Sequence, residues 1–228
     1  MTSISERLQA VRTGIDAAAV RVGRNPQDIH LLAVSKAHPA AAIREAFAAG
    51  QRRFGENYLQ EAQSKQASLG DLDIEWHFIG PIQSNKTQPI AQNFDWVHSV
   101  DRLKIAQRLN NARPEDLPPL QICLQVNVSN ELTKSGISIE ETPELAHAIS
   151  TLPHLVLRGL MAIPAPTNDA NLQREQFSRI RKLFESLQQQ GLKLDTLSIG
   201  MSDDYPAAIS EGSTMVRIGS AIFGPRTP

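Results

Sequence analysis

The feature of this sequence that most limits its possible folds is a repeated alternation of short apolar runs with longer, helix-like segments. Apolar runs too short for a helix are typical of buried strands, and apolar residues spaced three or four apart indicate helices. The strands expected on this basis are residues 29–35, 52–54, 75–79, 96–99, 120–128, 155–163, 194–199 and 214–218. The expected helices are residues 3–22, before the first strand, and then residues 39–49, 57–68, 84–92, 101–112, 140–151, 171–190 and 203–212.

Strands that alternate with helices are typical of parallel β–α units, and eight such units predict an α/β fold, a single (β/α)8 or TIM barrel formed by residues 1–228 as one domain. After the last strand and Gly219 only residues 220–228 remain, too few for a full covering helix, so the extra N-terminal helix is expected to take that place. Ser3 and Glu6 form a capping-box pattern at its start. The alternative is an open, doubly wound sheet, but no glycine-rich dinucleotide fingerprint follows the first strand.

Composition excludes several classes of protein. With 23 Lys and Arg against 24 Asp and Glu, the chain lacks the basic character of a general nucleic-acid or membrane-surface binder. One cysteine, Cys123, excludes a disulfide framework and a cysteine-rich zinc site, and we expect it to be inert core. The six histidines lack metal-ligand spacing, so no metal is expected. The absence of a secretory signal and of an apolar membrane span favours a cytoplasmic protein. The sequence has no exposed apolar stripe that would indicate a dimer, so a monomer is expected.

In barrels of this kind the functional residues lie on the loops at the C-terminal ends of the strands. Lys36 follows the first expected strand, and strand alternation puts it on the same face as Val34 and Leu32, toward the barrel mouth. Desolvation there would lower the pKa of the amine and favour the neutral form that makes a Schiff base. A lysine that only extends from a strand end into solvent explains the same pattern.

The loops after the seventh and eighth strands have the composition of a phosphate site. Gly200 would let the backbone approach a ligand, Ser202 could cap the helix at 203–212, and Gly219 and Ser220 follow the last strand. Barrels often bind phosphate with these two loops and a helix N-terminus. Ser202 could equally be a helix cap that needs no ligand.

Other polar residues near strand ends have two interpretations each. Arg217 lies inside the last strand, where a cation must be paired, either with a barrel carboxylate or with a bound ring or anion. Asn57 follows the second strand and could cap the next helix. His77 is most simply a hydrogen-bonded core histidine, and Lys134 a solvated loop lysine.

Seven short motifs occur along the chain: AVSK at 33–36, FGENY at 54–58, WHFIG at 76–80, SG at 135–136, RGLM at 158–161, GMSDD at 200–204 and GSTMVRIG at 212–219. In this order they resemble the YggS/PROSC family of pyridoxal 5′-phosphate (PLP) homeostasis proteins, over about residues 3–224. The resemblance implies the fold of the alanine racemase N-terminal barrel, the type III fold of PLP proteins, with PLP held as a Schiff base on Lys36.

The resemblance also implies the rest of the site. The cofactor-binding residues carried over are Lys36, Asn57, Ser202, Arg217, Gly219 and Ser220. Among these, positions 202, 219 and 220 would bind the phosphate and position 217 would face the pyridine nitrogen. Bacterial relatives often have a second lysine where this chain has His38, so transfer of PLP to position 38 is not expected, and Lys134 is left as a candidate secondary acceptor.

The function implied is a non-catalytic PLP-binding protein that buffers the cofactor or delivers it to apo PLP-dependent enzymes. One alternative is a PLP-dependent amino-acid racemase with weak activity. Racemisation needs proton donors on both faces of the substrate; Lys36 could serve one, and Tyr205 could approach the mouth, but nothing marks it as a base. Another alternative is a PLP-free aldolase that uses Lys36 on a sugar phosphate.

Overall fold

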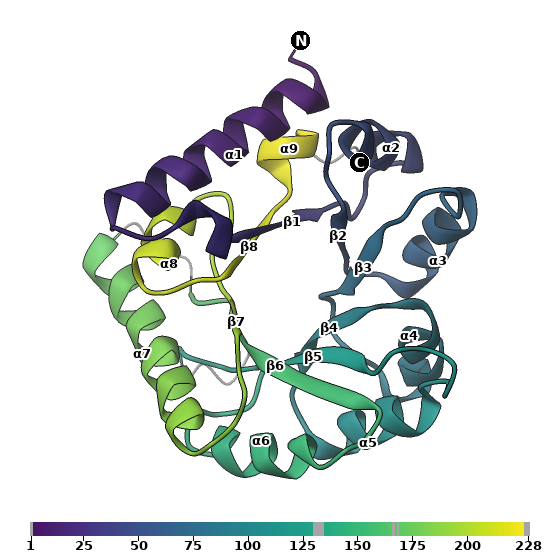
Figure 1. Cartoon of the computed structure of the whole chain (residues 1–228), viewed down its shortest axis with the longest axis vertical. Helices are drawn as coiled ribbons and strands as arrows, with labels where there is room; N and C mark the ends of the chain where they lie inside the picture. The colour runs from purple at the N-terminus through teal and green to yellow at the C-terminus, as the bar shows by residue number, and fades with distance from the viewer. Residues whose placement is uncertain (1, 130–134, 166, 168, 226–228) are drawn as a thin grey trace.

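Strand β1 (His30–Val34) pairs in parallel with both β2 and β8, and this closes the sheet into a barrel in sequence order (Figure 1). The computed structural model of the chain describes residues 2–129, 135–165, 167 and 169–225. The other strands are β2 Arg53–Glu56, β3 Glu75–Phe78, β4 Trp96–Val100, β5 Leu120–Gln125, β6 Leu155–Met161, β7 Thr196–Ser198 and β8 Met215–Ile218. The predicted eight-stranded parallel barrel is confirmed.

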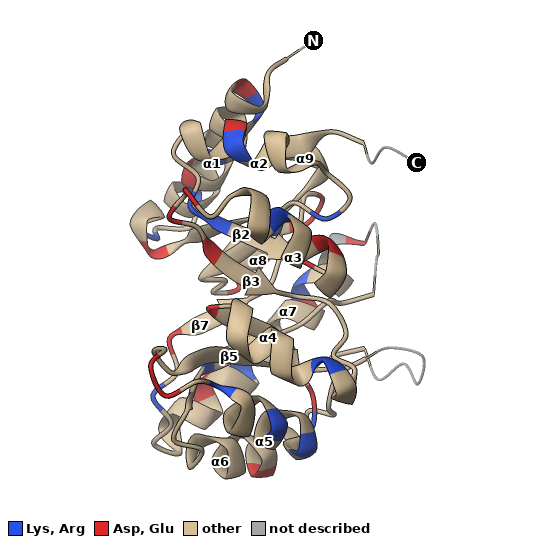
Figure 2. Ribbon diagram, turned by 90° about the vertical axis from the view of Figure 1, so that its right-hand side faces the viewer, with Lys and Arg blue, Asp and Glu red and all other residues tan. Residues whose placement is uncertain are grey.

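Helices surround the barrel (Figure 1). They are α1 Ile4–Arg21, α2 Ala40–Ala48, α3 Leu59–Ser68, α4 Thr87–Asn93, α5 Leu103–Ala112, α6 Thr142–Ser150, α7 Ala170–Gln189, α8 Tyr205–Ser210 and α9 Ser220–Phe223, with short 3-10 helices η1 Pro26–Asp28 and η2 Ser84–Lys86. Within the described ranges, none of them combines the length and the apolar character that crossing a membrane requires. Lysine, arginine, aspartate and glutamate are interspersed along these elements in the view of Figure 2.

Helix α1 covers the seam between the first and last strands, as expected. It packs against α2, α8 and α9. The predicted capping box is present at its start: the Ser3 hydroxyl accepts from the Glu6 N–H, and the Glu6 carboxylate accepts from the Ser3 N–H at 2.7 Å. Leu8 and Ile15 are buried on its inner face. The extra helix therefore takes the place of a covering helix after β8.

The element boundaries differ from the predicted ones where apolar character extends past the hydrogen-bonded strand. Strand β5 ends at residue 125, although Val126 and Val128 remain buried. Val126 makes an isolated bridge to Ile137, and its N–H still donates to the Met161 carbonyl at 2.8 Å. Helices η1 and α9 were not expected, because three or four residues are too few for a helical pattern in the sequence.

The centre of the barrel is more polar than is usual for this fold. Val216 and Ile218 belong to the apolar core between sheet and helices, so alternation turns Arg217 toward the barrel axis. The same alternation turns inward Leu32, His77, His98, Cys123 and Ser198. Barrel centres are usually filled with branched aliphatic side chains, so the buried polar groups must find partners among themselves.

Candidate functional site

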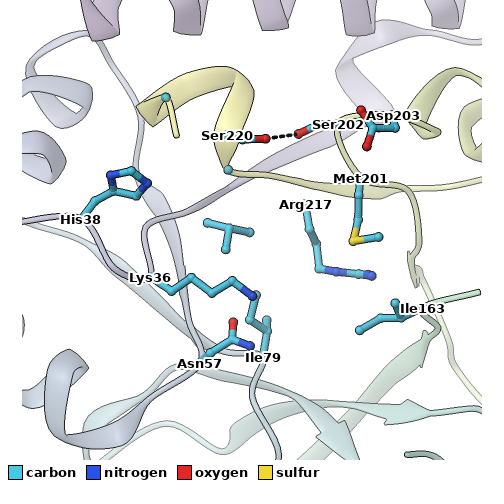
Figure 3. Close-up of a pocket in the computed structure, with 13 residues that line it drawn as sticks. Lys36, His38, Asn57, Ile79, Ile163, Met201, Ser202, Asp203, Arg217 and Ser220 are labelled. Atoms are coloured by element: carbon cyan, nitrogen blue, oxygen red, sulfur yellow. Dashed lines mark hydrogen bonds between the residues drawn. The ribbon is translucent and has the colours of Figure 1, made fainter. Parts of the chain in front are cut away.

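A cavity of about 270 Å³ opens at the C-terminal ends of the strands. All six residues predicted to bind the cofactor line it (Figure 3): Lys36, Asn57, Ser202, Arg217, Gly219 and Ser220. They come from the segments that follow β1, β2 and β7 and from β8 and the loop after it. The barrel thus brings together, in one hollow, residues up to 184 positions apart in the chain (220 − 36).

Lys36 follows β1, and its side chain extends into the cavity toward Asn57 and Ile79 (Figure 3). Val34 lines the same cavity, and Leu32 is fully buried below it. This is the shared face that strand alternation predicts. The interpretation of Lys36 as a strand-end lysine directed into solvent is wrong, because the side chain is half-buried in the hollow.

Two serine hydroxyls lie on the other side of the cavity. The Oγ atoms of Ser202 and Ser220 lie 3.5 Å apart, and Ser220 is the first residue of α9 (Figure 3). Gly219 follows β8 and directly precedes Ser220, and a Cβ at this position would lie only 3.0 Å from the carbonyl oxygen of Val34. The first N–H groups of a helix have no acceptor within it, so hydroxyl and N–H donors gather at this wall.

Two expectations about the loop after β7 are wrong. Ser202 does not cap a helix: α8 begins at Tyr205, and its N-cap residue Asp204 accepts from the Met201 N–H. Gly200 does not line the cavity; it has φ +96°, and a Cβ there would lie 2.7 Å from the Ala208 side chain. Glycine is therefore needed for the turn onto α8, and the Ser202 hydroxyl is left for the cavity.

Arg217 is held by neutral acceptors. Its Nη1 donates to the main-chain carbonyl and to the hydroxyl of Ser198, the latter at 2.9 Å, and its Nη2 donates to the Ala162 carbonyl at 2.9 Å. Among the described residues no carboxylate forms an ion pair with it, so the predicted alternative of a barrel ion pair is wrong. Burial lowers the pKa of Arg217 to about 10, which leaves the guanidinium charged at neutral pH. Two of its five N–H donors, Nε–H and one on Nη2, remain for the cavity.

A hydrogen-bonded chain leads from Ser198 through the barrel centre. The Ser198 hydroxyl lies 3.0 Å from Nδ1 of His98, whose Nε2 lies 2.8 Å from Nδ1 of His77, and Nε2 of His77 lies 2.8 Å from a Glu75 oxygen. Burial lowers the pKa of His77 and, further, that of His98. If the Glu75 carboxylate accepts from Nε2–H of His77, the Nδ1 of neutral His77 is an acceptor, and His98 donates its Nε2–H to it. The Nδ1 of neutral His98 then accepts the Ser198 hydroxyl proton, and the Ser198 oxygen accepts from Arg217.

Asn57 carries the clearest sign of a missing partner. Its Oδ1 is buried without a hydrogen-bond partner among the described residues. The N-cap of α3 is Tyr58, so the interpretation of Asn57 as a helix cap is wrong. A buried amide oxygen without a donor is costly. Together with the two remaining Arg217 donors, this atom fits a polar molecule in the cavity.

Several other candidates lie elsewhere. Tyr205 does not line the cavity and instead packs against α1, where a Cβ on Gly14 would lie 2.4 Å from its hydroxyl. Cys123 is fully buried, and burial raises its pKa to about 12, in agreement with an inert core thiol. His77 is the hydrogen-bonded core histidine that was expected. Lys134 lies outside the described residues. Over the described ranges no three His, Cys, Asp or Glu residues gather into a metal site.

Comparison with known proteins identifies the family. The model of the alanine racemase N-terminal domain matches residues 7–227. A pyridoxal phosphate homeostasis protein of Pseudomonas aeruginosa is 61% identical over 226 residues, which are 99% of this chain and 97% of that protein. The chain belongs to the pyridoxal phosphate homeostasis protein family. The Escherichia coli K12 member is 55% identical over 229 residues, 99% of this chain and 98% of its own.

Solved structures agree with the family and the fold. PipY of Synechococcus elongatus PCC7942 is 42% identical and aligns over 97% of this chain and all of its own, with a TM-score of 0.88 without PLP and 0.86 with PLP bound. Alanine racemase of Corynebacterium glutamicum aligns over 97% of this chain and 62% of its own with a TM-score of 0.70 at 19% identity, which shows the shared barrel alone. The alanine racemase-like fold predicted from the motifs is confirmed.

Proposed function

We propose that this chain binds PLP in the barrel mouth, holds it as a Schiff base on Lys36, and serves to buffer or deliver the cofactor inside the cell. The observation that supports the proposal is that an amine and a pair of hydroxyls lie on opposite sides of one cavity, which Arg217 also lines (Figure 3). PLP is an aldehyde that also carries a phosphate, so it needs these two kinds of group in one site. The family membership and the PLP-bound PipY structure support the same conclusion.

Each lining residue has a task that suits its chemistry. Lys36 supplies the amine for the aldehyde. Ser202, Gly219 and Ser220 supply hydroxyl and backbone donors for the phosphate, and each hydrogen bond to a charged group is worth about 1.5–3 kcal/mol. Arg217 faces the pyridine ring with the donors that Ser198 and Ala162 do not use.

Arg217 also argues for storage of the cofactor rather than catalysis with it. The electron-sink chemistry of PLP uses a ring nitrogen kept protonated by an acidic partner. A guanidinium offers only donors and a positive charge, so it favours the unprotonated ring. The site is therefore proposed to have no catalytic residues and to keep the aldehyde available for exchange.

A weak amino-acid racemase remains the second candidate. It needs a proton donor on each face of the substrate. Besides Lys36, the described lining residues with a titratable group suited to this are His38 and Asp203; the His38 ring stacks on Phe223 at 5.1 Å, and Asp203 is exposed at the rim. Ring stacking and exposure at the rim do not by themselves place either group opposite Lys36.

We propose a single PLP-binding domain over residues 1–228 that acts as a monomer in the cytoplasm and passes PLP to apo forms of PLP-dependent enzymes. The near-neutral charge supports a protein without nucleic-acid or membrane-surface partners.

Absorption spectra and an activity assay test the proposal together. Titration of the purified protein with PLP should produce the visible band of a protein-bound Schiff base at one PLP per chain, and pyridoxal without phosphate should bind far more weakly. The loaded protein should racemise L-alanine no faster than free PLP does. Failure to bind PLP would favour the aldolase alternative, and racemisation at an enzymatic rate would favour the racemase.

A further inference from the structure

A buried ionic cluster lies behind the Lys36 loop, outside the cavity. Its members are Ser35 after β1, Glu56 at the end of β2, and Glu61 and Lys65 on α3. Glu56 and Ser35 are completely buried and Lys65 is 5% exposed. None of the four lines the cavity that holds Lys36. Buried charges are costly, so a cluster of this kind calls for a role.

The cluster forms hydrogen bonds with Ser35, the residue before Lys36. The Lys65 ammonium donates to the Ser35 carbonyl at 2.8 Å, to Glu56 Oε1 at 2.7 Å and to Glu61 Oε1 at 2.6 Å. The Ser35 hydroxyl donates to the same Glu56 oxygen at 2.6 Å. Ser35 is thus fixed through both its carbonyl and its side chain.

The same cluster forms a hydrogen bond with Ala37, the residue after Lys36. The Ala37 N–H donates to Glu61 Oε1 at 2.6 Å. Ala37 has φ +60°, and within the part of the chain that the structure describes it is the one residue other than glycine with a positive φ. L-residues adopt this left-handed conformation at a cost, and such conformations persist where surrounding contacts enforce them. The Glu61 contact is one of these, and the turn hydrogen bond from the His38 N–H to the Ser35 carbonyl at 3.1 Å is another.

We infer that Glu61 and Lys65 are positioning residues for Lys36, which hold the peptide on both sides of it so that its amine is presented to the cavity. The inference rests on the proposed function, because it assigns these residues a task in binding the PLP aldehyde. It also accounts for the choice between two neighbouring lysines. All three N–H donors of Lys65 are given to two carboxylates and a carbonyl, so Lys65 is a structural cation and Lys36 is the amine that reacts.

The test separates presentation of the amine from general binding. Glu61→Ala removes the acceptor of Ala37, and its side chain is partly exposed, so the variant should fold. Gln60→Ala, an exposed neighbour on α3, is the matched control. Lys65→Met is a second variant, expected to be less stable because it leaves Glu56 buried without its cation.

Two ligands are titrated: PLP, and 4′-deoxypyridoxine 5′-phosphate, which keeps the ring and phosphate but lacks the aldehyde. Glu61→Ala should weaken PLP binding by about tenfold or more, since a misplaced reactive amine is costly. It should change the affinity for the analogue by no more than about twofold, because Ser202, Gly219 and Ser220, which are proposed to bind the phosphate, are unchanged. Equal weakening of both ligands, or PLP binding equal to that of the Gln60→Ala control, would overturn the inference.

A second measurement does not depend on PLP. Hydrogen exchange of the Ala37 amide in the cofactor-free protein should be faster in Glu61→Ala than in the wild type or in Gln60→Ala. Unchanged exchange would overturn the inference. If wild-type protein bound PLP no more tightly than the analogue, the proposed function would fail. The exchange measurement would still decide whether Glu61 holds the Ala37 amide.

Discussion

The hydroxyl oxygen of Ser198 on β7 lies 2.9 Å from Nη1 of Arg217 on β8. Through this contact one barrel strand orients the cation of its neighbour with a neutral acceptor. Arg217 also lines the cavity that contains Lys36, and its remaining donors are not used by Ser198 or Ala162. The behaviour of bound PLP should therefore respond to changes on either side of this contact.

Replacing Ser198 with alanine should destabilise the barrel and disturb Arg217. The change leaves one N–H of Arg217 and Nδ1 of His98 without the hydroxyl partner, and an unsatisfied buried group costs about 1–3 kcal/mol. The measurement is the free energy of unfolding in urea, with exposed Ser210→Ala as the control. A loss no larger than that of the control would contradict the proposed chain.

Replacing Arg217 with glutamate should change the electronic character of bound PLP. A carboxylate near the ring nitrogen favours its protonation, whereas the guanidinium opposes it. We expect an altered visible spectrum and faster reaction of the loaded protein with amino acids. Arg21→Glu makes the same charge change at an exposed position on α1. An unchanged spectrum and reactivity in a folded, PLP-loaded Arg217→Glu protein would show that Arg217 does not face the ring.

Replacing Ser202 with alanine should weaken PLP binding through the phosphate. Loss of one hydrogen bond to a charged group, about 1.5–3 kcal/mol, corresponds to a loss of affinity of about tenfold or more. Binding of pyridoxal, which lacks the phosphate, should be unaffected, and Ser210→Ala should bind PLP normally. If wild-type protein bound pyridoxal as tightly as PLP, the assignment of the phosphate site to Ser202, Gly219 and Ser220 would be wrong.

Acid should destabilise the fold through the buried histidines. Burial lowers the pKa values of His77 and His98 below the ordinary value of 6.5, so the unfolded chain binds more protons as the pH falls below that value. Their contribution to stability is present above pH 6.5 and is lost on acidification, by at most about 1.4 kcal/mol per pH unit for each histidine.

Unfolding in urea at pH 7, 6 and 5 measures this effect. The free energy of unfolding should fall with pH, and His98→Gln should have a shallower slope over the same interval. Because His154 is only partly buried, His154→Gln is the control and should keep the wild-type slope. Equal slopes in the wild type and in His98→Gln would contradict the assignment.

Much of the fold could be predicted from the sequence, because parallel strands buried on both faces leave short apolar runs that need no knowledge of their partners. The site could be found by one rule, that polar residues after successive strands meet at the barrel mouth. This rule located Lys36 after β1 and Ser220 after β8, which lie far apart in the chain and line one cavity.

What could not be predicted depends on contacts between distant strands. His98 and Ser198 are 100 positions apart, and only the closed barrel brings them within 3.0 Å. The signal that could have found them is a polar residue at an inward position of an expected strand. The cap of α8 was assigned wrongly because Ser202 and Asp204 both suit an N-cap, and the turn at Gly200 decides between them.

We expect Lys36 to be the residue that carries PLP. Reduction of the PLP-loaded protein with sodium borohydride, followed by peptide mass spectrometry, fixes the cofactor to whichever amine holds it. We expect a pyridoxyl group on Lys36 at about one per chain, absent from Lys36→Ala. A pyridoxyl group found mainly on another lysine, such as the buried Lys65 or Lys134, would contradict this assignment.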